Sequence, residues 1–109
     1  MEESRVGDVS VVAVAGTVDM LTAPKLEEAI NSALKSSPTA VVVDMSAVEF
    51  LASAGMGVLV AAREQLGDGA RFAVVADGPA TSRPLKLVGI TEVVELFATL
   101  DEALSALKT

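Results

Sequence analysis

A serine followed by small residues is the segment of this chain with the clearest chemical potential. Ser53 precedes Ala54, Gly55 and Gly57, at the start of a run with helical spacing. One interpretation is that Ser53 only caps the helix while the glycines permit close packing. Another is that its hydroxyl, flanked by small side chains at a helix N-terminus, meets a partner protein and accepts a phosphate. The residue types alone leave both interpretations open.

A third interpretation, a hydrolase nucleophile, fits the sequence poorly. The flanks read Leu51-Ala52-Ser53-Ala54-Gly55, which lacks the first glycine of the G-x-S-x-G turn. The chain has no histidine to accept the serine proton and no cysteine, so imidazole bases, thiolate nucleophiles and Cys/His zinc sites are excluded. Lys35 or Lys86 would act as a base only in an unusual arrangement. We therefore expect no catalytic residues and no enzymatic activity.

Two carboxylates, Asp19 and Asp44, follow apolar runs that read as strands and are candidates for a cation site. The sequence supplies no third ligand beside them, and neither the G-x-G-x-x-G nor the G-K-[ST] phosphate loop occurs. Such residues more often cap loops and helices. We expect no metal and no cofactor.

Length, charge and hydropathy restrict the class of protein. The 109 residues, 51% of them hydrophobic, fit a single domain over residues 1–109. Eight basic against fifteen acidic residues give a net charge of −7, which disfavours binding to nucleic acid and to anionic membranes. The longest uncharged stretch, residues 50–62, is shorter than the roughly 18 to 20 residues of a membrane span. With an acidic N-terminus unlike a signal peptide and no cysteine, a cytoplasmic protein is expected.

The elements that position these side chains alternate along the chain. Apolar, β-branched runs predict strands at residues 4–6, 9–15, 40–44, 71–76 and 93–97. Helical spacing predicts helices at residues 24–36, 53–66, 81–88 and 99–107. Thr22 is expected to cap the first of these helices, and the second is so apolar that most of its first three turns should be covered by neighbours. The order predicts an α/β sandwich with a mixed, mostly parallel sheet of about four to five strands and about four helices.

In such sheets the functional surface forms beyond the C-terminal ends of the strands. Two segments occupy that position, residues 16–22 after the first long strand and residues 44–57 after the next parallel one. We expect both to contribute to one partner-binding surface. Its candidate residues are Asp19, Thr22, Ala52, Ser53, Ala54, Gly55 and Gly57.

The segment from Asp44 to Val60, DMSAVEFLASAGMGVLV, resembles the hallmark of STAS domains in the anti-sigma factor antagonist family. That hallmark is roughly D-[LF]-S-x-[VL]-x-[FY]-[LM]-D-S-[SA]-G-[LM]-G-[VL]-L. The run Gly16-Thr-Val-Asp19 is similar to the family's G-E-[LIF]-D, and the run from Leu85 to Ile90 is similar to its L-x-x-x-G-[LI]. The resemblance covers essentially the whole chain and implies a single STAS domain.

The resemblance implies a function in partner switching. In this family the unphosphorylated antagonist binds an anti-sigma factor, often an ATP-dependent serine kinase, and so frees a sigma factor. Phosphorylation of the serine in the D-S-[SA]-G segment breaks the complex, and a phosphoserine phosphatase restores it. That serine corresponds to Ser53.

Two departures from the family pattern affect this implication. Ala52 stands where the family has aspartate, and Thr17 stands where it has glutamate, whereas Asp19 is retained. If the missing aspartate helps the kinase, phosphorylation would be slow or lost while binding persists. The alternative function is a STAS binding module without a phosphorylation cycle, in a stress-signalling or lipid-transport complex.

Overall fold

The computed structural model describes residues 1–66, 69–87, 89–90 and 94–107. In chain order the strands are β1 (Glu2–Val6), β2 (Val9–Val18), β3 (Ala40–Leu51), β4 (Arg71–Val75) and β5 (Glu95–Phe97). The helices are α1 (Ala23–Leu34), α2 (Ser53–Leu66), α3 (Ser82–Leu87) and α4 (Leu100–Leu107). The predicted helix end at residue 88 and strand start at residue 93 lie outside the described residues.

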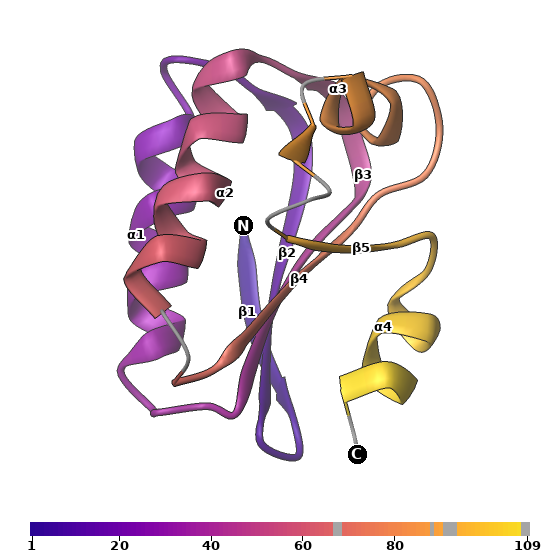
Figure 1. Ribbon diagram of the computed structural model, residues 1–109. Helices are drawn as coiled ribbons and strands as arrows, with labels where there is room; N and C mark the ends of the chain where they lie inside the picture. The colour runs from indigo at the N-terminus through magenta and orange to yellow at the C-terminus, as the bar shows by residue number, and fades with distance from the viewer. Residues whose placement is uncertain (67–68, 88, 91–93, 108–109) are drawn as a thin grey trace.

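The strands form one mixed sheet in the order β1-β2-β3-β4-β5 (Figure 1). β1 is antiparallel to β2, and every later neighbour pair is parallel. The hairpin between β1 and β2 turns at Gly7 and Asp8, with Gly7 at a positive φ of 61° that a two-residue hairpin favours. The predicted α/β class, the mixed sheet and the antiparallel first strand are confirmed.

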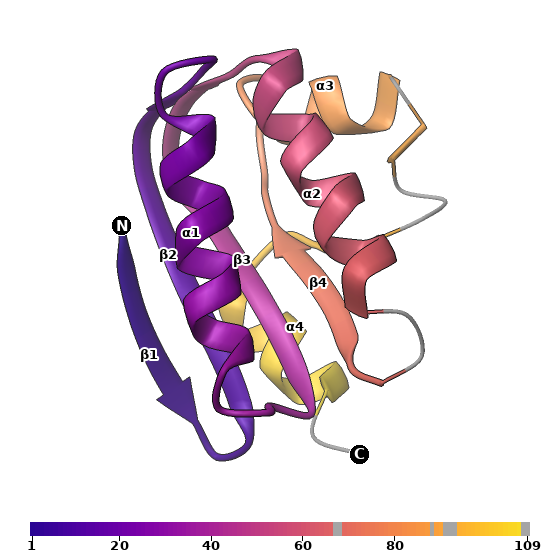
Figure 2. The same ribbon diagram turned by 90° about the vertical axis from the view of Figure 1, so that its left-hand side faces the viewer.

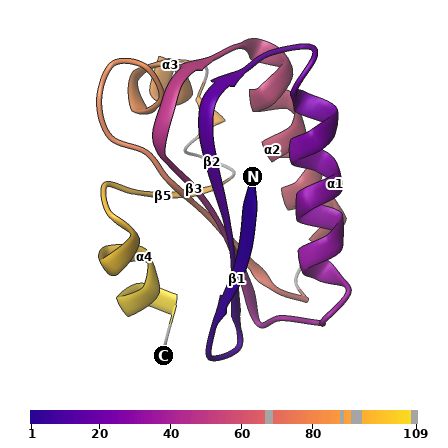
Figure 3. The ribbon, with the colours of Figure 1, turned by 180° about the vertical axis from the view of Figure 1, so that it is seen from behind.

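Helices cover the two faces of the sheet unequally. α1 and α2 lie along one face, over a core of almost wholly aliphatic side chains that includes Val12, Val43 and Leu59 (Figure 2). On the other face α4 covers one end, where Ala103 and Leu107 pack against a smaller cluster (Figure 3). α3 lies at the opposite end of the molecule from α4. Among the described residues, no helix combines the length and apolarity needed to cross a membrane.

Both long strands run further than predicted. β2 continues to Val18 rather than Ala15, and β3 continues to Leu51, so most of the predicted loop after Asp44 is strand. The sequence pattern did not reveal this continuation, because polar residues interrupt the apolar run of β3. The register of the β2–β3 pair also shifts in this region. Buried residues then recur as Met45, Val48 and Leu51, at every third position rather than every second.

The prediction that neighbours cover most of the first three turns of α2 holds only in part. Gly55, Leu59 and Ala62 are buried, but Gly57 and Ala61 are exposed. The half-buried residues of these turns include Met56, Val58 and Val60. α2 packs on the sheet by one narrow stripe, because α1 and α3 lie beside it rather than over it (Figure 2). The remaining apolar side chains are left at the surface.

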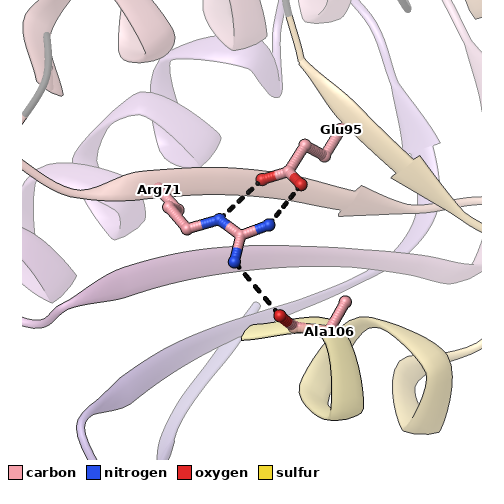
Figure 4. A network of polar contacts seen from close by, with 3 residues as sticks. All are labelled: Arg71, Glu95 and Ala106. Carbon is pink, nitrogen blue, oxygen red and sulfur yellow. Dashed lines mark hydrogen bonds and ion pairs between the residues drawn. The ribbon is translucent and has the colours of Figure 1, made fainter. Parts of the chain in front are cut away.

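The C-terminal helix is attached through Arg71 at the start of β4 (Figure 4). Its guanidinium donates to both carboxylate oxygens of Glu95 on β5 and, over 3.1 Å, to the carbonyl of Ala106 in α4. The hydrogen bond with Glu95 raises the pKa of Arg71. Both side chains are about half exposed, so the pair orients α4 more than it stabilises the fold.

Candidate partner-binding surface

The ends of β2 and β3 bring the two predicted segments together. Val18 is paired with Leu51, and the amide of Ala52 donates a 2.8 Å hydrogen bond to the carbonyl of Val18. The turn into α1 and the start of α2 therefore lie side by side at one end of the sheet (Figure 2). The two segments are therefore close enough to contribute to one surface.

Asp19 organises the turn between β2 and α1. Its Oδ1 accepts hydrogen bonds from the amides of Leu21 (2.9 Å) and Thr22 (3.2 Å) and lies 3.3 Å from the Thr22 hydroxyl. The Thr22 hydroxyl in turn accepts from the Asp19 amide at 2.8 Å and donates to the Thr17 carbonyl at 3.0 Å. One carboxylate oxygen and one hydroxyl thus hold the turn closed.

The predicted cap of α1 is right in position and wrong in its bonds. Thr22 is the N-cap residue, but its side chain makes no capping hydrogen bond with the helix. The reason is that the hydroxyl points back into the turn, where the Asp19 amide and the Thr17 carbonyl already satisfy it. Asp19 and Thr22 therefore shape this surface as well as being candidates to touch a partner.

Large apolar side chains stand out at the same strand ends. Met20 is 79% exposed, Leu21 is 83% exposed and Phe50 is 56% exposed. Apolar residues exposed together on a small domain mark binding sites for other proteins. None of these three residues was predicted to take part, although Met20 and Leu21 form an apolar pair inside a polar turn. This apolar pair is the sequence feature that could have predicted their exposure at the surface.

Ser53 occupies the first helical position of α2 rather than its cap. Ala52 is the cap residue, because its carbonyl accepts from the amides of Gly55 (3.0 Å) and Met56 (3.3 Å). The cap of α2 therefore lies one residue before the predicted position, Ser53. Its side chain is exposed and has no hydrogen-bond partner within the described part of the chain. The amides of Ser53 and Ala54, at the first two helical positions, have no acceptor within the helix.

The two glycines of the segment have different environments. A Cβ on Gly55 would lie 2.5 Å from Val18 Cγ1 and 2.8 Å from Leu51 Cδ1, so this glycine permits α2 to lie against the strand ends. A Cβ on Gly57 would meet nothing within 4 Å, and the residue is exposed. The close-packing interpretation holds for Gly55, whereas Gly57 faces outward with Ser53.

The exposed side of α2 continues into a shallow groove shared with α1. Its lining comprises Glu27, Ile30, Asn31, Val58, Ala61, Ala62 and Gln65. Polar groups of both helices border apolar residues there, an arrangement typical of surfaces that bind proteins. The surface formed by the Asp19 turn, the start of α2 and this groove is called the strand-end surface below.

The structure does not assemble the carboxylates into a cation site. Asp44 Oδ1 accepts from the amide (3.0 Å) and hydroxyl (2.7 Å) of Ser46, whereas Asp19 serves its own turn. No group of three or more potential metal ligands occurs among the residues described.

Comparison with known proteins supplies the family. A family model of the STAS domain matches residues 2–103. The anti-sigma-F factor antagonist RsfB of Mycobacterium tuberculosis is 44% identical over 100 residues, covering 92% of this chain and 82% of the relative. The crystal structure of an anti-sigma factor antagonist from Mycobacterium paratuberculosis is 48% identical, with a TM-score of 0.94 over 99% of this chain and 92% of that one.

A more distant solved structure shares the fold. The anti-sigma factor antagonist SpoIIAA in its unphosphorylated form is 17% identical, with a TM-score of 0.74 over 96% of this chain and 94% of that one. The family match, the relatives and the arrangement of strands and helices agree with the hallmark segment of the sequence. The chain belongs to the STAS-domain family of anti-sigma factor antagonists.

Proposed function

We propose that this protein binds an anti-sigma factor through the strand-end surface and so releases a sigma factor to RNA polymerase. The observation that carries the proposal is the exposure of Met20, Leu21 and Gly57 beside a free Ser53 hydroxyl. The names of the relatives as anti-sigma factor antagonists support the class of partner. Because sigma factors act on RNA polymerase, the protein would work in the cytoplasm.

The proposed role is binding rather than catalysis. The surface has no histidine or cysteine, and its carboxylate at the strand ends, Asp19, is engaged in holding a turn. The surface offers exposed apolar side chains and, at Gly57, a part of the helix without a side chain that another backbone can approach. Both are properties of a docking site.

Phosphorylation of Ser53 is the proposed switch. The side chain is exposed, and the unpaired amides at the start of α2 favour an anion there. Because the chain has no nucleotide loop, the phosphate would come from a separate kinase, such as an anti-sigma factor that uses ATP. A phosphoserine phosphatase would then restore the binding form.

Ala52 favours the alternative function, a STAS binding module without a phosphorylation cycle. It stands one residue before Ser53, where the family pattern has aspartate, so no carboxylate is beside the hydroxyl in sequence. Labelling with radioactive ATP separates the two functions. Phosphate on the parent protein but not on Ser53→Ala supports the switch, whereas no labelling by any kinase that binds the protein supports the constitutive module.

Competition for the anti-sigma factor tests the main proposal. A fluorescently labelled sigma factor bound to its anti-sigma factor should be displaced by the parent protein, which is read by anisotropy. Gly57→Arg should weaken displacement by about a hundredfold or more without unfolding the domain, because it fills a bare part of the surface. The matched control is Ser105→Arg, an exposed position on α4. Equal displacement by both variants would place the docking site elsewhere.

A further inference from the structure

β1 is an edge strand whose outer side is open. It is the first strand in the sheet order, and all five of its residues are exposed. Figure 2 shows β1 alongside β2 with no described element on its other side. An open edge of this kind is a template for another strand.

The hairpin register determines which backbone groups of β1 face outward. Val6 is paired with Val9 across a two-residue turn, so this pair exchanges both hydrogen bonds of the ladder. Alternation along the antiparallel pair then directs the backbone groups of Glu2, Ser4 and Val6 toward β2. The amides and carbonyls of Glu3 and Arg5 consequently face solvent at the edge.

We propose that a second copy of this chain docks on this edge, with its own β1 antiparallel and the two-fold axis at Ser4. Glu3 then lies opposite Arg5 of the second copy, and Arg5 lies opposite its Glu3. These are the residues whose backbone groups face outward, so each pair exchanges two backbone hydrogen bonds. Side chains directly opposite each other are within reach of ion pairing. The result is a continuous sheet through both copies.

Charge selects this register among those that preserve the hydrogen bonding. Moving the second strand by two residues in one direction sets Glu3 opposite the other Glu3, and moving it in the other direction sets Arg5 opposite Arg5. Like charges opposite each other are destabilising, so both alternatives are disfavoured. Charged residues on edges usually prevent pairing altogether. Here the order Glu3-Ser4-Arg5 is complementary to itself when reversed.

The side chains of the two residues lie on the same side of the strand. Glu3 is paired with Val12 and Arg5 with Ser10, two β2 residues that share one face. Neither Glu3 nor Arg5 has an ion pair within the described part of the chain, so both are available. Because a five-residue edge buries less than the roughly 1,200 Å² of a standard interface, we expect a weak dimer.

Sedimentation velocity of the full chain at low micromolar and millimolar concentration tests the proposal. The parent should be monomeric at the lower concentration and dimeric at the higher. Glu3→Arg and Arg5→Glu should each be monomeric throughout, because each places like charges opposite. Their equimolar mixture should dimerise again, since one variant is positive at both positions and the other negative at both.

Matched controls exclude effects of net charge. Glu102→Arg on α4 changes the charge by the same amount as Glu3→Arg and should leave the dimer intact, and Arg83→Glu does the same for Arg5→Glu. The double variant Glu3→Arg with Arg5→Glu is complementary to itself again and should dimerise like the parent. A parent that stays monomeric at millimolar concentration, or a dimer that survives the single reversals, would overturn the proposal. Circular dichroism of each variant verifies that it is folded.

Discussion

Two glycines separated by a single residue illustrate how differently one residue type is used in this protein. Gly55 lies on the side of α2 that packs against Val18 and Leu51, whereas Gly57 lies on the side that faces solvent. We expect Gly55→Ala to lower the free energy of unfolding, because overpacking costs about 1–3 kcal/mol and exceeds the gain in helix propensity. Gly57→Ala should raise it by about 0.5–1 kcal/mol, the ordinary gain of replacing glycine within a helix.

Urea unfolding of the two alanine variants beside the parent measures both changes. Opposite signs are the expected result, and a similar loss in both would mean that Gly57 also has a covered environment. The sequence identified both glycines as special, but residue type and spacing did not distinguish a packing role from an exposed one. That distinction depends on how far α2 is rotated about its axis, which the strand ends determine.

Asp19 presents a second question at the scale of the residue, because it shapes a turn and also belongs to the proposed docking surface. Asp19→Asn keeps an oxygen able to accept from the amides of Leu21 and Thr22, whereas Asp19→Ala removes it. If the role is positional, the asparagine variant should bind the anti-sigma factor nearly as well as the parent, and the alanine variant should bind at least tenfold more weakly.

Isothermal titration calorimetry with the three proteins distinguishes the two roles. Equal loss of affinity in both variants would show that the partner uses the negative charge itself. Thermal melts of the same proteins show whether a loss of affinity reflects unfolding instead.

At the scale of the elements, the sequence predicted the order, type and approximate place of the helices and strands. Its errors cluster at the ends of β2 and β3, where the extension to Leu51 was missed. Period-two alternation identifies strands only while the register is regular, and a shift in pairing disrupts it at this site. The surface exposure of α2 was missed for a different reason. A helix that is apolar nearly all round in its first turns is ordinarily buried, and here the arrangement of α1 and α3 leaves it partly exposed.

The start of α2 also carries a prediction. Ala52 is the cap residue and has no side-chain acceptor, so the amides of Ser53 and Ala54 lack a cap, whereas the amide of Gly55 donates to the Ala52 carbonyl. Ala52→Asp should therefore stabilise the domain by about 0.5–2 kcal/mol, because a carboxylate at this position accepts from the first turn and interacts favourably with the helix dipole. Ala52→Asn, which caps without a full charge, should give a smaller gain.

Thermal and urea unfolding at neutral pH measure these differences. No gain in either variant would indicate that the side chain at position 52 points away from the helix axis. The result also bears on phosphorylation, since a cap carboxylate and a phosphate on Ser53 would compete for the same amides. With alanine at position 52, the amides of Ser53 and Ala54 remain available to the phosphate.

At the scale of the whole molecule, the sheet and its two apolar clusters form a body on which the strand-end surface is carried. The hydroxyl of Ser53 is exposed and bonded to nothing in the described chain, so no element depends on it. A chemical change there has no packed neighbour through which to alter the sheet. We therefore expect phosphorylation to act on binding without a conformational change of the domain.

The free energies of a phosphate at a helix N-terminus and of one inside an interface support this expectation. A phosphate adds about −1.5 to −2 charges, and at a helix N-terminus an anion typically contributes about 0.3–1 kcal/mol of stability. Inside a protein interface the same charge would be buried without a partner, at a cost of about 3–5 kcal/mol. That cost corresponds to a loss of affinity of about a hundredfold or more. Phosphorylated protein should thus melt at the same temperature as the parent or slightly above it, yet bind the anti-sigma factor far more weakly.

Paired melts and titrations of the parent, the phosphorylated protein and Ser53→Ala test this prediction. Ser53→Ala should bind as well as the parent, because the complex requires only that no charge is present at this position. Amide chemical shifts on phosphorylation should change at the start of α2 and in the Asp19 turn, and remain constant along β4 and α4. Shift changes across the sheet, or a much lower melting temperature, would instead mean that the phosphate rearranges the domain, because Val41, Val42 and Val43 in the middle of the sheet are fully buried beneath the surface that carries Ser53.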